Sequence, residues 1–106
     1  MKSKNLLKAL PSDLSEEVFE TLISSDTIEI ERIVSHGHSS PKTGWYQQDR
    51  HEWVLVMEGA AKLEFENDKV IKLSVGDYIN IPKGCRHKVI WTKPDQATIW
   101  LAIHYL

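Results

Sequence analysis

The residues of this chain that could carry chemistry are five histidines, one cysteine and a set of acidic and aromatic side chains. His36 and His38 are separated by one residue, a spacing that places two imidazoles on one face of a strand and can form a metal pair. The pair lies in a stretch rich in Gly and Ser, and such polar segments usually form loops. We therefore predict a solvated loop there, with a metal site as the alternative. Cys85 has no partner base near it in the sequence, so a nucleophilic role is not favoured.

A second group combines turn-forming residues with a histidine. Gly76, Pro82, Gly84 and His87 follow one another with five, one and two residues between them. Glycine tolerates a positive φ and proline presets its own φ, so we predict two turns, after which His87 opens a strand. The four positions resemble the second motif of the cupin superfamily, G(X)5PXG(X)2H(X)3N, with Trp91 in place of the final asparagine.

The first cupin motif, G(X)5HXH(X)3-4E(X)6G, is matched in its second half by Glu52 and Gly59. Its two histidine positions fall on Tyr46 and Gln48, so this half of the motif is degenerate. The chain resembles the small single-domain cupins of the RmlC-like superfamily, in a bacterial subgroup. The resemblance implies an all-β fold, a cupin-type antiparallel β-barrel or jelly roll.

The resemblance also implies a ligand set, because metal-binding cupins hold one divalent ion with these motif positions. Carried over, the metal ligands are His87, Glu52 and Gln48, with Tyr46 as a poor ligand at neutral pH. Such a set would suit Fe, Mn, Ni or Zn with several waters attached. The alternative is a metal-free polar cluster in the barrel mouth, bonded within itself and to a ligand.

Glu52 decides between these alternatives, because a carboxylate inside a barrel needs a cation or hydrogen-bond donors. An ion, protonated His87, Arg86, Arg50 or exposure at the mouth could satisfy it. Arg86 adjoins His87 and is predicted to point to the opposite face of the strand, as His51 does relative to Glu52.

Aromatic side chains and one further histidine could line a ligand pocket. Four tryptophans are many for 106 residues, and rings in a barrel serve as core filling or as pocket walls. We predict Tyr46 and Trp91 as lining because they are nearest to the motif positions. His104 shares a face with Trp100 and could join the pocket, with a hydrogen-bonded core histidine as the alternative.

The elements that position these residues differ on either side of residue 26. Over 12–23, Leu14, Val18 and Leu22 have helical spacing, and Asp13 with Glu16 fits a capping box. We therefore predict a short α-helix in a segment 1–26 that packs on a barrel formed by 27–106. Runs with a period near two follow residue 26, and we predict strands at 27–35, 44–48, 52–58, 61–66, 69–73, 78–81, 86–92 and 97–105.

Composition limits the class of protein. Hydrophobic residues make up 42% of the chain and charged residues 26%, as in one ordinary globular domain. The net charge of -2 argues against nucleic acid or an anionic membrane as partner. One cysteine cannot form an internal disulfide and no apolar run is long enough to span a bilayer, so we expect a cytoplasmic protein. The runs 53–57 and 99–103 are apolar on both faces, and we expect a homodimer to cover one of them.

We expect a barrel pocket that accepts a small polar metabolite, and three functions remain open. The first is a metal-dependent enzyme of the isomerase or dioxygenase type, whose ion polarises a substrate oxygen or activates O2. The second is a metal-free binding or sensing module without catalysis. The third is a structural cupin whose dimer surface matters more than its pocket. The fold alone does not separate them.

Overall fold

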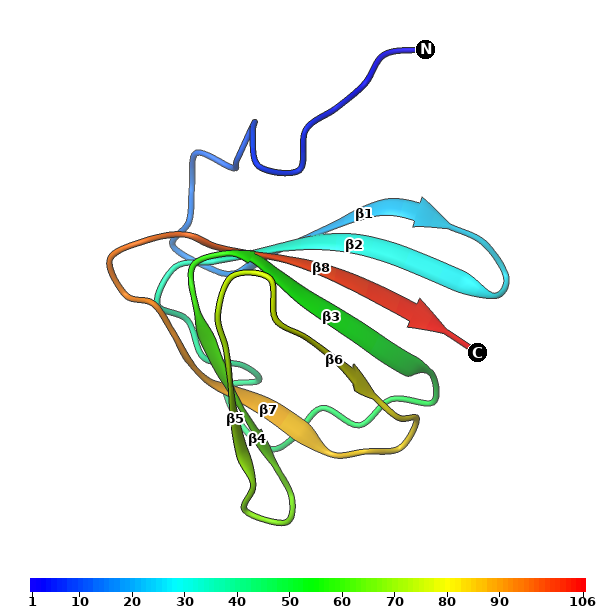
Figure 1. Cartoon of the computed structure of the whole chain (residues 1–106), viewed down its shortest axis with the longest axis vertical. Helices are drawn as coiled ribbons and strands as arrows, with labels where there is room; N and C mark the ends of the chain where they lie inside the picture. Colours follow the sequence, from blue (N-terminus) through cyan, green and yellow to red (C-terminus); the bar gives the residue numbers. More distant parts are fainter.

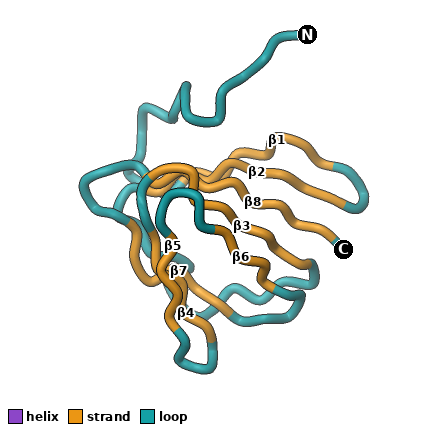
Figure 2. Tube along the Cα trace, viewed as in Figure 1, coloured by secondary structure: helices purple, strands orange, loops and turns teal.

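The structure is a computed structural model that describes residues 1–106. It consists of strands and loops, with no helix (Figure 2). The eight strands are β1 (Val18–Ser24), β2 (Ile28–Ser35), β3 (His51–Glu58), β4 (Ala61–Phe65), β5 (Val70–Leu73), β6 (Tyr78–Ile81), β7 (His87–Thr92) and β8 (Thr98–Tyr105). Accordingly, the chain contains no helix with the length and hydrophobicity needed to cross a bilayer.

The strands form two antiparallel sheets that lie against each other (Figure 1). One sheet has five strands in the order β1-β2-β8-β3-β6, and the other has three in the order β5-β4-β7. Seven of the expected strands are confirmed with shifts of one residue at their ends. The expected strand 44–48 is wrong, because Tyr46 forms only an isolated bridge with His87. The all-β prediction is therefore correct.

The helix predicted over 12–23 is wrong, because part of this stretch forms the edge strand β1. The β-branched residues Val18, Thr21 and Ile23 favour a strand, and pairing with β2 supplies ladder hydrogen bonds that a helix could not offer to that edge. Asp13, expected to cap the helix, instead accepts a hydrogen bond from the Ser15 backbone N–H at 3.0 Å. The helical spacing of the apolar residues is thus overridden by tertiary pairing.

The segment that precedes β1 is held by a buried arginine. Arg32 on β2 forms an ion pair with Glu20 and donates to the carbonyl oxygens of Leu6, Lys8 and Ala9 at 2.7 to 3.1 Å. Since the next residue of β2 faces the core, Arg32 lies on the outer face of the five-stranded sheet. The N-terminal segment therefore packs on the barrel from outside without being helical.

The core fills the space between the two sheets. Alternate residues of each strand point inward, as in β3, where Val54 and Val56 are buried and their neighbours are half-buried. Leu63 of β4 and Trp100 of β8 meet them from the other strands. Toward the end of the barrel where β3 and β7 begin, the buried residues Glu52, His87 and His104 replace apolar ones, and this end contains the candidate site.

Candidate functional site

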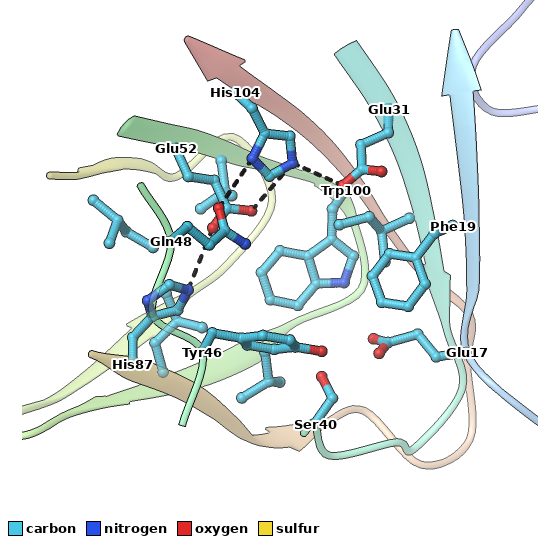
Figure 3. A pocket seen from close by; sticks show the side chains of 15 residues that line it. Glu17, Phe19, Glu31, Ser40, Tyr46, Gln48, Glu52, His87, Trp100 and His104 are labelled. Carbon is cyan, nitrogen blue, oxygen red and sulfur yellow. Dashed lines mark hydrogen bonds and ion pairs between the residues drawn. The ribbon is translucent and has the colours of Figure 1, made fainter. Parts of the chain in front are cut away.

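A cavity lies between the sheets at the polar end of the core. The cavity has a volume of about 70 Å³, which is enough for a few water molecules or the polar end of a small ligand. Its walls combine apolar, aromatic and ionisable side chains. They are Glu17, Phe19, Glu31, Ile33, Ser40, Tyr46, Gln48, Glu52, Val54, Leu63, Ile81, His87, Val89, Trp100 and His104 (Figure 3).

Glu52 and His87 meet in this cavity from different sheets. Glu52 lies on β3 and His87 at the start of β7, and Glu52 Oε1 is 3.3 Å from His87 Nε2. Both are buried, Glu52 with 8% of its surface exposed and His87 with 5%. The side chain of Glu52 accepts no hydrogen bond, and its second oxygen is 3.8 Å from His104 Nε2. The carboxylate is therefore aimed into the cavity without a protein donor.

The tautomer of His87 follows from its other ring nitrogen. His87 Nδ1 lies 3.1 Å from the carbonyl oxygen of Cys85, an acceptor, so Nδ1 carries a proton and donates it. In the neutral ring, Nε2 then presents a lone pair to the Glu52 carboxylate. Two acceptors cannot bond each other, so a proton or a cation must lie between them.

Tyr46 and Gln48 are fixed next to this pair by backbone hydrogen bonds. Tyr46 exchanges two of them with His87, N to O at 2.8 and 3.0 Å, and Gly84 N–H donates to the Gln48 carbonyl oxygen at 2.8 Å. Burial raises the pKa of the Tyr46 phenol, which keeps it protonated at neutral pH. Tyr46 therefore presents a hydroxyl group that can donate a hydrogen bond in the cavity, whereas Gln48 offers a neutral oxygen.

His104 lies across the cavity mouth from His87, on β8. Its Nε2 is 2.8 Å from Glu31 Oε1, and its Nδ1 is 3.2 Å from Gln48 Oε1. The hydrogen bond to Glu31 raises the pKa of His104 above its usual value, against a smaller opposing effect of burial. Since both partners are acceptors, His104 is an imidazolium that donates from both nitrogens and orients Gln48.

Glu29, Glu31 and His104 also place one ligand atom each within 4.8 Å of one another and could hold an ion. The donor set fits an ion poorly, because Glu31 Oε1 and His104 Nε2 lie 2.8 Å apart, a hydrogen-bond distance shorter than the separation of two ligands of one ion, and Glu29 forms an ion pair with Arg50 at 3.1 Å. A proton on His104 already satisfies this cluster.

The opposite end of the cavity has a carboxylate of its own. Glu17, from the segment just before β1, accepts a short hydrogen bond from Ser35 Oγ, which accepts one from Trp100 Nε1 at 3.2 Å. Figure 3 shows Glu17 beside the hydroxyl groups of Tyr46 and Ser40, with the Trp100 ring between this end and Glu52. The polar side chains thus form two groups at the two ends of one cavity.

The sequence-based interpretation missed Glu17 and Glu31. Glu31 could have been found, because it shares the inward face of its strand with Ile33. Glu17 could not, because it lies in the stretch that was expected to be helical and outside every expected strand. The remaining lining residues that were missed, Phe19 and Ser40, lie on the edge strand and in a loop, where no periodic pattern identifies them.

Trp91 does not line the cavity. A register shift between β4 and β7 pairs Trp91 with Lys62, and the Lys62 ammonium lies 5.2 Å from the centre of the ring. Because Ala61 and Leu63 on either side of Lys62 are buried, this pair faces outward. The bulge therefore reverses the alternation that would have turned Trp91 inward after Val89.

The basic and histidine alternatives weighed from the sequence lie elsewhere. Arg86 pairs with Glu66 on the surface, and Arg50 pairs with Glu29. His38 accepts a hydrogen bond from the His36 backbone N–H through Nδ1 and contacts the Ser15 carbonyl oxygen through Nε2. Both of its ring nitrogens are therefore occupied by hydrogen bonds to the protein backbone. No lysine or arginine lines the cavity.

The Glu52 and His87 donors fit one divalent ion. Two ligand atoms at about 2.1 Å from an ion lie about 3.0 to 3.4 Å apart in octahedral or tetrahedral geometry, and the observed separation is 3.3 Å. Gln48 Oε1 keeps a lone pair besides the one that faces His104. These residues would supply two strong ligands and one weaker one, and waters or a ligand would complete the shell.

Comparison with known proteins agrees with this architecture. A family model described as the cupin domain matches residues 30–104. The chain belongs to the cupin family. Among the curated proteins no match was found.

Solved cupin structures share the fold over almost the whole chain. A proposed mannose-6-phosphate isomerase from Ralstonia eutropha JMP134 is 38% identical, with a TM-score of 0.92, over 99% of this chain and 98% of that one. An RmlC-like cupin from Desulfovibrio desulfuricans is 23% identical, with a TM-score of 0.76, over 98% and 96%. A cupin superfamily protein from Desulfitobacterium hafniense DCB-2 is 18% identical, with a TM-score of 0.75, over 92% and 84%.

Proposed function

We propose that this cupin binds one divalent metal ion between Glu52 and His87, with Gln48 as a weaker ligand, and a small polar metabolite in the adjoining cavity. The observation that carries the proposal is the pair of facing acceptors: a buried carboxylate without a protein donor, 3.3 Å from an imidazole nitrogen whose lone pair faces it. An ion turns this unfavourable contact into two bonds.

The surrounding residues would prepare the cavity for a ligand. Once bound, the ion would act as a Lewis acid that polarises an oxygen of the ligand. Tyr46 donates a hydrogen bond from its protonated phenol, and the Glu31–His104 pair holds the Gln48 amide in place. Val54 and Leu63 exclude water from the apolar side. These are the parts that proton transfer on a carbonyl or hydroxyl compound requires.

An isomerase-type reaction is the activity that this arrangement favours. The neighbour that is 38% identical carries a proposed sugar-phosphate isomerase activity, and the cavity combines the proposed metal ligands Glu52 and His87 with a hydrogen donor, Tyr46. The phosphate of such a substrate does not follow from the site, since no lysine or arginine lines the cavity to bind it. The proposal is therefore a metal-dependent isomerase of an unphosphorylated compound.

The second candidate is a metal-free binding module, and one observation favours it. The imidazolium of His104 lies 3.8 Å from Glu52 Oε2 and supplies part of the positive charge that the carboxylate needs. In this alternative, a proton shared by Glu52 and His87 replaces the ion.

Metal analysis separates the two candidates. We expect protein purified without chelator to contain one Fe, Mn, Ni or Zn ion per chain, and the content to fall below a tenth in His87→Ala. His36→Ala, in the loop histidine pair, is the matched control and should keep the ion. Adding the ion to EDTA-treated protein at 100 times its Kd should stabilise the wild type by about 2.7 kcal/mol. Metal-free wild type with an unchanged Tm in all four ions would contradict the proposal.

A further inference from the structure

The Glu17 end of the cavity contains a carboxylate with one unused oxygen. Trp100 Nε1 donates to Ser35 Oγ, and Ser35 donates to Glu17 Oε2, so this chain of donors ends on one carboxylate oxygen. Glu17 Oε1 accepts no hydrogen bond, and Glu17 forms no ion pair with the protein. In Figure 3 the carboxylate is directed toward the space beside Tyr46 and Ser40.

Three aromatic rings line the same end of the cavity as this carboxylate. They belong to Phe19 on β1, Tyr46 and Trp100 (Figure 3). The faces of such rings carry partial negative charge and attract cations, and a carboxylate in the same wall adds to this attraction. Tyr46 and Ser40 contribute hydroxyl groups, so polar hydrogen-bonding partners are present as well.

The protein has no cation of its own to fill this position. Arg32 is committed to Glu20 on the outer face, and Arg50 is paired with Glu29. The Lys88 ammonium lies 4.3 Å from the centre of the Trp45 ring, outside the cavity, and 3.5 Å from Glu64. The half-buried Glu17 carboxylate is therefore open to a cationic group of a ligand.

Charges across the whole cavity agree with this conclusion. Glu31 is paired with His104 and Glu52 faces His87, whereas no cationic side chain faces Glu17. An anionic ligand would then meet the Glu17 carboxylate without a partner, whereas a monocation would be paired there.

We propose that the Glu17 end is a binding subsite for a protonated amine, and that the ligand of this cupin is a small amino alcohol or amino polyol. The ammonium group binds between Glu17 and the rings of Phe19 and Trp100, and a hydroxyl group points to the Glu52 and His87 end. This inference rests on the proposed function for the hydroxyl end alone; the amine subsite stands without an ion.

A charge series on one carbon skeleton tests the subsite. We would titrate 3-amino-1,2-propanediol, glycerol and glycerate into the full chain at pH 7, once with EDTA and once with the ion found by metal analysis. The readout is the Trp100 indole N–H signal in a nitrogen-15 correlation spectrum, assigned with Trp100→Phe, because this group donates into the chain that ends on Glu17. We expect the aminodiol to bind at least tenfold more tightly than glycerol. Glycerate should bind most weakly of the three compounds.

Two substitutions locate the preference. Glu17→Gln keeps an oxygen that can accept from Ser35 but removes the charge, and it should abolish the preference for the amine. Glu16→Gln, at the exposed neighbouring position, should retain it. Glycerol binding as tightly as the aminodiol, or a preference that survives Glu17→Gln, would overturn the subsite.

The same variants distinguish this inference from the proposed function. Glu17→Gln should bind the ion normally, whereas Glu52→Gln should lose the ion and keep the preference for the amine in EDTA. A wild-type protein that binds no ion but prefers the amine would refute the metal site alone. The reverse pattern would refute the amine subsite alone.

Discussion

Glu52 Oε1 on β3 and His87 Nε2 on β7 lie 3.3 Å apart across the two sheets, and His87 Nδ1 is committed to the Cys85 carbonyl oxygen. This relationship links the fold to the site, because each strand belongs to a different sheet and the contact forms only when the barrel closes. It also requires a proton or a cation between the two atoms, because both are hydrogen-bond acceptors.

The first prediction concerns Glu52→Gln. A glutamine amide can donate to His87 Nε2, so the substitution replaces two facing acceptors by a hydrogen bond. In EDTA we expect the variant to be more stable than the wild type by about 1 kcal/mol, measured by urea unfolding. With the ion present the order should reverse, since the variant loses a charged ligand.

Glu58→Gln, on the same strand but outside the cavity, should match the wild type in both conditions. A Glu52→Gln variant that is less stable than the wild type in EDTA would show that protein groups already satisfy the carboxylate.

The second prediction concerns pH and His104. The pKa of His104 is raised in the folded protein by Glu31, so the folded state binds this proton more tightly than the unfolded state. The resulting stabilisation is fully present below the unfolded-state pKa of about 6.5 and is lost as pH rises through the folded-state pKa. In EDTA we expect the Glu31–His104 hydrogen bond to contribute on the order of 1 kcal/mol at pH 6 and little at pH 9.

Urea unfolding of Glu31→Gln at the two pH values measures this contribution. The difference between wild type and variant should shrink from pH 6 to pH 9. Glu66→Gln, which removes an exposed ion pair with Arg86, is the control and should show no such trend. An equal loss of stability in Glu31→Gln at both pH values would contradict a charged His104.

The third prediction concerns Gly59, which matches the last glycine of the first cupin motif. Gly59 has a φ of +84°, and a Cβ there would lie 2.3 Å from Thr98 Oγ1 and 2.7 Å from Thr98 Cα. Gly59→Ala should destabilise the protein by about 1–2 kcal/mol for the left-handed backbone and by about 1–3 kcal/mol more for overpacking. Gly44→Ala, with a φ of +74° and open space around it, should show only the backbone cost. Equal Tm values for the two variants would show that the contact with Thr98 relaxes without cost.

The fourth prediction is the homodimer. The outer face of the five-stranded sheet carries half-buried Leu101 and Ile103, and β1 and β6 add Ile23 at 58% and Tyr78 at 65% exposure. Such an apolar face favours a second copy of the chain. Sedimentation at micromolar concentration should give twice the mass of one chain, and Ile23→Lys, at an exposed position, should weaken association. A wild-type mass of one chain would refute the dimer.

The sequence predicted those features of the fold and the site that depend on residues close together in the chain. The turns at Gly76 and Gly84 are formed by residues that adopt a positive φ. These turns place His87 at the start of its strand without depending on distant parts of the chain. Glu52 was predictable for the same reason, because it follows from a motif with fixed spacing. The convergence of these two residues was therefore within reach of the sequence.

Features that depend on pairing between distant strands were not predictable. The apolar residues of 12–23 have helical spacing, and pairing with the edge of β2 selects a strand that carries Phe19 to the cavity, with Glu17 in the segment just before it. Trp91 faces outward because of a bulge in the pairing of β4 with β7. The type of residue at position 91 does not predict this bulge.

The two ends of the cavity are formed by different parts of the chain. Glu52 and His87 belong to interior strands that also build the core, whereas Glu17 and Phe19 come from the outermost strand and the turn leading into it. Substitutions in β1 and the turn before it would change the proposed ligand specificity while the proposed metal ligands stay in place. Evolution could thus change the ligand specificity of such a scaffold through substitutions in its first twenty residues. Protein engineering could do the same by replacing this segment with that of a related chain.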